Sequence, residues 1–391
     1  MNYLKIKNFG PVKDATIELK PFLVLIGGQG TGKSTIAKLL SIFQDYLWYV
    51  HILEKKDDII LPFSLFGISD YFQDNTFFEY RKDDIRLSYS QGNFSISSSD
   101  FDSVEAFLSF IKECIYDEHV RLMKDLNLDV TESIEEFFGK KNNLLNSINR
   151  TLLYIPAERN FASQFTKYIA SMIIANIPIP IIEMNYISYF EKARKSFPTY
   201  HSSVLNVTYK YNDGEEGIIV NKNGKQESLS LEYCSSGIQS LLPMLMILDY
   251  CLDKNIFDGF VIEEPEQNLF PDNQLATLRH IISKRNHSKS TCIITTHSPY
   301  LLSGINISLM AGQVARYKVY KDEVCNILPA EYHLTPGRVT AYALGDTDNY
   351  CKDIINPQTG TIDQNYLDTT STVIGQEFGK LYKLYIKTLK G

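Results

Sequence analysis

The chain has 391 residues, 44% of them hydrophobic and 22% charged, which is the composition of an ordinary globular protein with a sizeable core. Its apolar runs are too short to cross a membrane and its N-terminus does not resemble a secretory signal. The six cysteines are scattered and form no CxxC pair, so we expect reduced thiols, a cytoplasmic protein and no membrane partner.

The formal net charge of −7 is unevenly distributed along the chain. Residues 45–150 carry 20 acidic and 11 basic side chains, whereas the remainder carries 26 acidic and 28 basic ones. An element that binds duplex DNA is expected to be basic, so this acidic segment is a poor candidate for that role. We interpret it as a solvated surface, with a surface for a protein partner as the alternative.

The first 44 residues predict strands followed by a helix. Residues 3–9 and 14–19 read as two strands joined by a turn at Gly10-Pro11, and residues 22–26 read as a buried strand. A helical pattern begins at about Gly32. Two short strands before a buried one suggest a small antiparallel sheet beside a parallel core.

The buried strand and the helix are separated by the sequence GGQGTGKST. Gly27, four further residues and then Gly32-Lys33-Ser34 match the P-loop spacing in its strand–loop–helix context. Glycines let backbone N–H groups curl around phosphate oxygens, and the helix start adds positive potential. We expect Lys33 to contact the β- and γ-phosphates and Ser34 to bind Mg²⁺. The residues predicted to bind ATP here are Gly27, Gly28, Gln29, Gly30, Thr31, Gly32, Lys33, Ser34 and Thr35.

Residues 45–150 read as a compact inserted subdomain. A hairpin-like stretch, IRLSYSQGNFSIS, precedes helical patterns at 104–115 and 132–147, and no heptad repeat is sustained. We therefore predict a mainly helical, acidic insertion at 45–150 in a discontinuous head formed by residues 1–44 and 151–391. The head resumes with a strand in YIPAERN, interrupted helices over 161–197 and a hairpin over 204–231.

The sequence EYCSSGIQSLLPMLMIL places small residues before a strongly apolar helix. Ser236 and Gly237 leave the first backbone N–H groups of that helix free to bind an anion. A plain serine N-cap is the alternative interpretation. The position of this motif between the P-loop and the next acidic motif favours a function.

In GFVIEEPEQNLFP an apolar strand ends in two carboxylates, Glu263 and Glu264. Adjacent strand residues point to opposite faces, so one carboxylate can lie near Mg²⁺ and the other near an attacking water. A further strand, residues 292–296, ends at His297, which can hydrogen-bond to a γ-phosphate. We predict Glu264, His297 and Lys33 as catalytic residues and Ser34 and Glu263 as metal ligands.

With these motifs the chain resembles the ABC-type ATPase heads of the SMC/RecF class, and within that class the OLD-type (overcoming-lysogenization-defect) ATPases of bacterial defence. The resemblance covers residues 1–44 and about 150–345, through LKIKNFGPVKDATIEL, GGQGTGKST, YIPAERN, SSGIQSLLPML, IEEPEQNLFP and TTHSP. It implies that Ser236, Gly237 and Gln239 form an ABC signature that closes on the ATP of the opposite subunit. It also implies that Glu264 is the catalytic base, His297 the switch histidine and residues 268–271 the D-loop.

The chain departs from the family pattern at several positions. Ile238 replaces the second glycine of the signature, and the Q-loop glutamine is either replaced in YIPAERN by Ala157-Glu158 or supplied by Gln44. OLD-type proteins often continue into a Toprim nuclease, but we interpret Asp346 and Asp348 as a turn or a cap. The terminal stretch GQEFGKLYKLYIKTL is predicted to be an amphipathic helix that packs on the head.

The expected fold is therefore α/β, an ABC-ATPase head of the P-loop NTPase class with an inserted subdomain. The resemblance implies slow, Mg²⁺-dependent ATP hydrolysis gated by formation of a homodimer or higher homo-oligomer. The leading hypothesis is a sensor or scaffold subunit of an anti-phage system that controls a separately encoded effector, a nuclease, as in PARIS and Septu systems. The alternative is a RecF-like repair ATPase that acts directly on DNA, and a transporter subunit is a third, less supported class.

Overall fold

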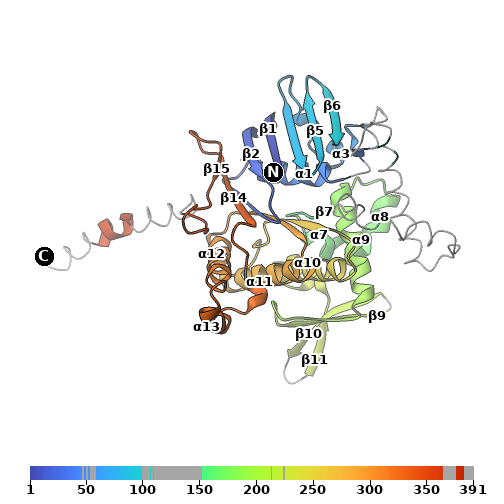
Figure 1. The fold of residues 1–391 in the computed structure, drawn as a ribbon. Coiled ribbons are helices and arrows are strands. Elements are labelled where there is room, and N and C mark those ends of the chain that lie inside the picture. Colours follow the sequence, from blue (N-terminus) through green and yellow to red (C-terminus); the bar gives the residue numbers. More distant parts are fainter. Residues whose placement is uncertain are drawn as a thin grey trace, which may run out of the picture.

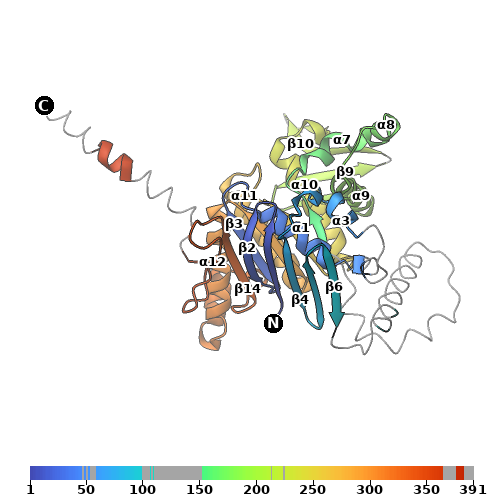
Figure 2. The same cartoon turned by 90° about the horizontal axis from the view of Figure 1, so that it is seen from above.

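The structure is a computed structural model. It describes residues 1–45, 48, 49, 52, 59–98, 106, 109, 152–212, 214–222, 225–363 and 376–382. Figure 1 shows the arrangement of the elements along one view and Figure 2 the same fold from above.

A six-stranded sheet forms the centre of the molecule, in the order β15-β14-β3-β13-β12-β7. All neighbouring strands are parallel except β15, which runs antiparallel to β14 at the edge. Because the strands are parallel, their carboxyl ends meet at one edge of the sheet, where loops can assemble a site. The strands are β3 (Phe22–Gly27), β7 (Leu152–Ile155), β12 (Gly259–Glu263), β13 (Thr291–Thr296), β14 (Val339–Leu344) and β15 (Cys351–Asp353).

Strand β3 separates two hydrophobic cores. Its side chains alternate between the faces of the sheet, as the period of a strand requires. Phe22, Val24 and Ile26 pack into the core on the side of the long helices, whereas Leu23 and Leu25 pack into the core shared with α1 and the N-terminal strands. This two-sided burial explains why all six residues of β3 are buried.

The helices divide between these two cores (Figures 1 and 2). Helix α1 lies on the side of the N-terminal strands, and α9 to α12 lie on the opposite side. The longer helices are α1 (Lys33–Phe43), α9 (Ile181–Ser196), α10 (Ser236–Asp253), α11 (Pro271–Ser288) and α12 (Pro299–Val314). The shorter helices are α3 (Leu61–Leu65), α7 (Asn160–Phe165), α8 (Ile169–Ile174) and α13 (Lys321–Ile327).

A five-stranded antiparallel sheet packs over α1, in the order β2-β1-β4-β5-β6. The expected N-terminal pair is present, and the hairpin-like stretch IRLSYSQGNFSIS forms β5 and β6. Strand β4 pairs with β1, which joins residues 77–98 to the N-terminal sheet. The strands are β1 (Tyr3–Phe9), β2 (Val12–Glu18), β4 (Phe77–Lys82), β5 (Ile85–Ser90) and β6 (Asn93–Ser98).

This pairing shows that part of the segment 45–150 belongs to the sheet of the head. Residues 77–98 are not part of a separate helical insertion, because they complete the sheet of the head and bury Phe78, Tyr80 and Leu87 in its core. The helices predicted at 104–115 and 132–147 lie outside the described residues, except for 106 and 109. The local sequence pattern becomes weak after residue 45, which suggests a domain boundary there. Pairing between β1 and β4 is a long-range contact that such local patterns do not reveal.

A third, four-stranded antiparallel sheet lies beyond α9 and α10, in the order β11-β10-β9-β8. It contains the hairpin expected over residues 204–231, although parts of its turns at 213 and 223–224 lie outside the described residues. Its strands are β8 (Thr199–Ser202), β9 (Val207–Asn212), β10 (Glu215–Lys222) and β11 (Lys225–Leu229).

The C-terminal part adds strand β14 to the central sheet and a short helix beyond it. VTAYAL, a weak strand pattern, forms the fully buried strand β14 beside β3. Residues 376–382 are helical, and Phe378, Leu381 and Tyr382 are exposed, so this described part of the predicted helix does not pack on the head; residues 383–389 of it lie outside the described ranges. None of the helices in the described ranges has the length and apolar character needed to cross a membrane.

Candidate nucleotide-binding site

The P-loop lies between β3 and α1 in the predicted context. Gly27, Gly30 and Gly32 have φ values of 147°, 74° and 84°, which side-chain-bearing residues rarely adopt. A Cβ atom on Gly27 would lie 2.5 Å from the carbonyl oxygen of Leu344, the last residue of the neighbouring strand β14. The glycine at this position is therefore required by close packing as well as by backbone conformation.

Lys33 is folded back over its own loop. Its Nζ donates hydrogen bonds to the carbonyl oxygens of Gly27 at 3.0 Å and Gly28 at 2.9 Å. Burial lowers the pKa of Lys33, and the nearby carboxylates of Glu264, Glu266 and Glu263 oppose this shift. The ammonium group is thus held where the P-loop meets three carboxylates, the position expected of a group that contacts phosphate.

The other P-loop residues divide by exposure. Thr35 is buried in the first turn of α1, whereas Ser34 is exposed on that turn. Gly28, Gln29 and Gly30 are exposed at the tip of the loop. The loop therefore presents mainly backbone groups and the Ser34 hydroxyl to a ligand.

Strand β12 carries the two acidic residues to the same edge of the sheet. Glu263 is 5% exposed, and its Oε2 accepts a hydrogen bond from the backbone amide of Ala157 at 3.4 Å. Its Oε1 has no hydrogen-bond partner in the described part of the chain. The loop YIPAERN thus lies against this carboxylate, where the resemblance places the Q-loop.

Glu264 leaves the strand in an unusual conformation. Its φ of 43° lies in the left-handed region, which costs a non-glycine residue on the order of 1–3 kcal/mol. Its amide donates to the carbonyl oxygen of Thr295 at 2.9 Å. The consequence is that the Glu264 side chain turns toward β13 and keeps 36% of its surface exposed.

His297 meets Glu264 at the tip of β13. The distance from His297 Nε2 to Glu264 Oε1 is 3.5 Å, and the histidine side chain is 35% exposed. Both groups are therefore open to solvent and a ligand. Because β13 lies between β12 and β3, His297 lies between the end of the acidic strand and the P-loop.

Glu266 is a site residue that the sequence analysis did not single out. Its Oε1 accepts hydrogen bonds from the Thr296 hydroxyl and from the His297 amide, each at 2.7 Å. Burial raises the pKa of its carboxyl group, and the hydrogen bond from the His297 amide lowers it. The only sequence signal that could have found it is a third acidic residue, in Glu-Glu-Pro-Glu, directly before the polar D-loop.

The signature motif starts α10 as expected, but its residues face different ways. Ser235 and Ser236 are exposed, and the Ser235 side chain does not cap the helix. The first turn therefore keeps free N–H groups, consistent with an anion site rather than a side-chain cap. Gln239 is 7% exposed, and its Nε2 donates to the carbonyl oxygens of Glu232 and Cys234. In this chain its amide fixes the loop before α10, and its contact with nucleotide stays a prediction.

The signature packs on the D-loop of its own chain. A Cβ atom on Gly237 would lie 2.8 Å from the carbonyl oxygen of Asn268, whose φ is 61°. The two segments are thus in backbone contact. A glycine is required at residue 237 for this approach, which gives a packing reason for the glycine of the motif.

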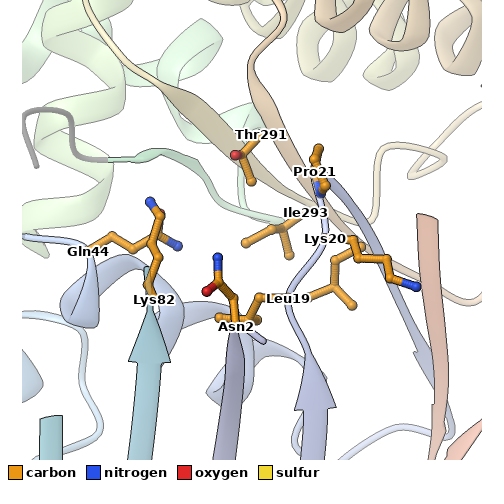
Figure 3. A pocket seen from close by; sticks show the side chains of 9 residues that line it. Asn2, Leu19, Lys20, Pro21, Gln44, Lys82, Thr291 and Ile293 are labelled. Carbon is orange, nitrogen blue, oxygen red and sulfur yellow. The ribbon is translucent and has the colours of Figure 1, made fainter. Parts of the chain in front are cut away.

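Gln44 lies at the wrong end of the molecule for a Q-loop residue. It caps the C-terminus of α1 and accepts a hydrogen bond from Lys82 Nζ at 2.9 Å. It lines a cavity of about 110 Å³, and Figure 3 shows it there together with Pro21 and Thr291, at the amino ends of β3 and β13. The P-loop is at the carboxyl ends of the same strands, so Gln44 is excluded as a Q-loop residue, and the assignment of the YIPAERN loop stays a prediction.

The segment LGDTDNY contacts the P-loop, a role the sequence did not reveal. The amide of Asp348 donates to Asp346 Oδ1 at 3.2 Å, which supports the interpretation of this pair as a turn. Just after it, the Tyr350 hydroxyl lies 2.7 Å from the Thr31 carbonyl oxygen and 2.9 Å from that of Pro11. The turn after β14 therefore braces the P-loop from the side.

A P-loop at the end of a buried strand, with carboxylates and a histidine on the next two strands, defines a P-loop ATPase of the α/β class. The chain belongs to the family described as AAA ATPase domain, whose model matches residues 1–302. No curated protein matches the sequence.

Several solved structures are similar to the chain. They are an Smc head bound to the C-winged helix domain of ScpA, an SMC head domain from Thermotoga maritima and a bacterial ABC transporter cassette solved as a dimer. The identities are 13%, 11% and 10%, and the TM-scores 0.42, 0.36 and 0.31. The matches cover 90%, 78% and 77% of this chain and 96%, 92% and 90% of the other chains.

Proposed function

We propose that this ATPase binds and hydrolyses ATP with Mg²⁺ in a nucleotide-closed dimer and serves as the sensor or scaffold subunit of a bacterial anti-phage system. The observation that carries the catalytic part is the 3.5 Å pair of Glu264 and His297, exposed beside a buried P-loop lysine. A carboxylate that must orient water has to be accessible, and the strained backbone at residue 264 gives it that exposure.

The donor groups fit Mg²⁺. The Ser34 hydroxyl is exposed at the start of α1, and Glu263 offers a buried carboxylate oxygen without a partner in the described residues. Mg²⁺ prefers hard oxygen ligands and is usually held by one or two protein groups together with phosphate oxygens. When bound there, the ion supplies neutralisation of phosphate charge.

The chain's own residues divide the remaining work. Backbone N–H groups of residues 28–32 and the Lys33 ammonium bind phosphate oxygens. Glu264 orients the attacking water and accepts its proton, and His297 donates a hydrogen bond to the terminal phosphate. The products are ADP and phosphate. Turnover is slow because this arrangement is completed only when a second subunit closes on the nucleotide.

Exposed aromatic side chains support the dimer. Tyr233 precedes the signature, Phe270 follows the D-loop and Tyr300 follows His297, and they are 73%, 82% and 53% exposed. All three belong to segments of the candidate site, so each leaves a large aromatic side chain in water in the monomer. Such residues commonly anchor protein interfaces. We assign them to the interface with a second copy of the chain.

The place in a defence system rests on the resemblance to OLD-type ATPases and to the ATPase subunits of PARIS and Septu. The effector is a separately encoded protein, a nuclease, that is restrained or released by the ATPase. The acidic charge of residues 45–150 opposes direct binding to DNA, so in this proposal the segment takes the alternative role of a surface for a protein partner.

A pull-down of the Glu264→Gln chain from its native host, with ATP and Mg²⁺ and after nuclease treatment of the lysate, tests the biological role. Recovery of an effector at fixed stoichiometry is the expected result. Recovery of the chain alone, with DNA appearing when the lysate is left untreated, would overturn the defence role in favour of a RecF-like ATPase.

A further inference from the structure

Arg159 is a buried cation at the centre of the candidate site. It follows the strand β7 in YIPAERN and is 1% exposed, one of the largest fully buried side chains. Its partners in the described chain are backbone carbonyls and a hydroxyl, with no carboxylate in direct contact. A buried charge without an ion pair is costly, so its position calls for a reason beyond packing.

The guanidinium group binds the two residues of the acidic motif through their backbones. Nη1 donates to the carbonyl oxygens of Glu263 and, at 3.1 Å, of Pro156, and Nη2 donates to the carbonyl oxygen of Glu264 at 2.8 Å. A planar fork can hold consecutive carbonyls in a fixed relation, which a lysine cannot do. These bonds lie next to the left-handed φ of Glu264, so they brace the strained peptide that turns its side chain toward His297.

The same side chain also reaches the signature helix. Arg159 Nε donates to the Ser240 hydroxyl at 3.3 Å, one helical turn after Ser236. The adjacent helix α7 adds a second contact, from the Ser163 hydroxyl to the Gln239 carbonyl oxygen at 2.5 Å. The acidic motif and the first turn of α10 are therefore connected through one buried residue.

We propose that Arg159 is a positioning residue that holds Glu264 in its active orientation and links this orientation to the signature end of α10. The link rests on the proposed function, in which Ser236 and Gly237 contact the nucleotide of the partner copy. Closure of the partner on α10 is then transmitted through Ser240 and Arg159 to the backbone of Glu264. ATP bound by one subunit thereby promotes the correct placement of the water-orienting carboxylate in the other.

Two variants test separately the contact of Arg159 with the acidic motif and its contact with α10. Arg159→Lys keeps the charge but removes the fork, and we expect kcat to fall about 10- to 100-fold with KM and ATP affinity within about twofold. Ser240→Ala removes only the hydrogen bond between Arg159 and α10. We expect it to bind ATP normally but to lose most of the rise in turnover per chain that accompanies increasing chain concentration.

Arg194→Gln is the matched control. Arg194 is also a buried arginine, but it lies in α9 and forms ion pairs with Glu191 and Glu216 instead of contacting the acidic motif. We expect this variant to lower Tm and to leave kcat unchanged. An unchanged kcat in Arg194→Gln would show that loss of a buried arginine alone does not reduce kcat.

The experiment measures steady-state ATPase rates of the full chain against ATP and against chain concentration, ATP affinity with a fluorescent analogue, and Tm. Folded Arg159→Lys with the wild-type kcat overturns the positioning role. Ser240→Ala with the wild-type concentration dependence overturns the link. The proposed dimer fails if the wild-type rate per chain is independent of chain concentration and Glu264→Gln stays monomeric with ATP. The link between α10 and Glu264 then fails with it. In that case kcat of Arg159→Lys still tests whether Arg159 positions Glu264 within one chain.

Discussion

The carboxylate of Glu266 accepts a hydrogen bond from the backbone amide of His297 at 2.7 Å, and the same oxygen accepts one from the Thr296 hydroxyl. The loop after β12 is thus joined to the tip of β13, one strand away. His297 also faces Glu264. The loop that carries the proposed catalytic carboxylate therefore also fixes the backbone of His297.

Burial of Glu266 predicts a stability change in Glu266→Gln. The pKa of Glu266 is raised from 4.5 by burial, so the folded state binds the proton more tightly than the unfolded state. Stability is then lost as pH rises from the unfolded pKa through the folded pKa, and the loss persists at higher pH. Glutamine keeps an accepting oxygen without the charge. We expect Glu266→Gln to have a higher Tm than the wild type at neutral pH, with the difference shrinking toward about pH 4.5.

Thermal unfolding across this pH range checks the expectation, with Glu331→Gln, at an exposed glutamate, as the control. A lower Tm for Glu266→Gln at neutral pH would show that the charged carboxylate stabilises the fold through these hydrogen bonds.

Lys33→Ala should abolish ATP binding. The Lys33 ammonium is already held at the P-loop by the carbonyl oxygens of Gly27 and Gly28, so it can contact phosphate with little reorganisation. Its removal leaves the loop without its cation. Titration with a fluorescent ATP analogue measures the change, and an affinity still in the millimolar range or tighter would contradict the assignment.

Glu264→Gln should bind ATP but hydrolyse it about 10²- to 10⁴-fold more slowly, because glutamine cannot accept a proton from water. The amide is nearly isosteric and leaves the left-handed backbone to the same contacts. We expect an ATP-dependent dimer to accumulate, measured by light scattering after size-exclusion chromatography. An unchanged hydrolysis rate would remove Glu264 from the role of base.

The motifs that carry chemistry could be predicted from the sequence because they are local. The P-loop, the end of β12 and the tip of β13 each depend on a few consecutive residues, and their order fixes the parallel core. The chain segment at 77–98 could not be placed, because its pairing with β1 is set by a partner about 70 residues away. The roles of Glu266, Arg159 and Tyr350 could not be placed either, because their hydrogen bonds join segments that are far apart in the sequence.

Gly237→Ala should separate ATP binding from dimer formation. The new Cβ atom would lie 2.8 Å from the Asn268 carbonyl oxygen, so the start of α10 or the D-loop has to shift. The P-loop is untouched, and ATP affinity of the monomer should stay within about twofold, while the ATP-dependent dimer of the Glu264→Gln background should weaken by about tenfold or more. Ser235→Ala, at an exposed serine that does not cap α10, is the control. If Gly237→Ala dimerises as strongly as the Glu264→Gln background alone, the signature does not lie in the interface.

Phe270→Ser should weaken the dimer without affecting the nucleotide site. Phe270 is 82% exposed at the N-cap of α11, next to the D-loop, so its ring has little to stabilise in the monomer. An aromatic side chain that acts as an interface hot spot contributes about 2 kcal/mol, which corresponds to a rise of about thirtyfold in the dimer Kd. Tyr317→Ser is the matched control, because Tyr317 is 65% exposed beyond the far end of α12. Sedimentation of the Glu264→Gln background with ATP should show dissociation for Phe270→Ser alone, and equal dissociation of both variants would place the interface elsewhere.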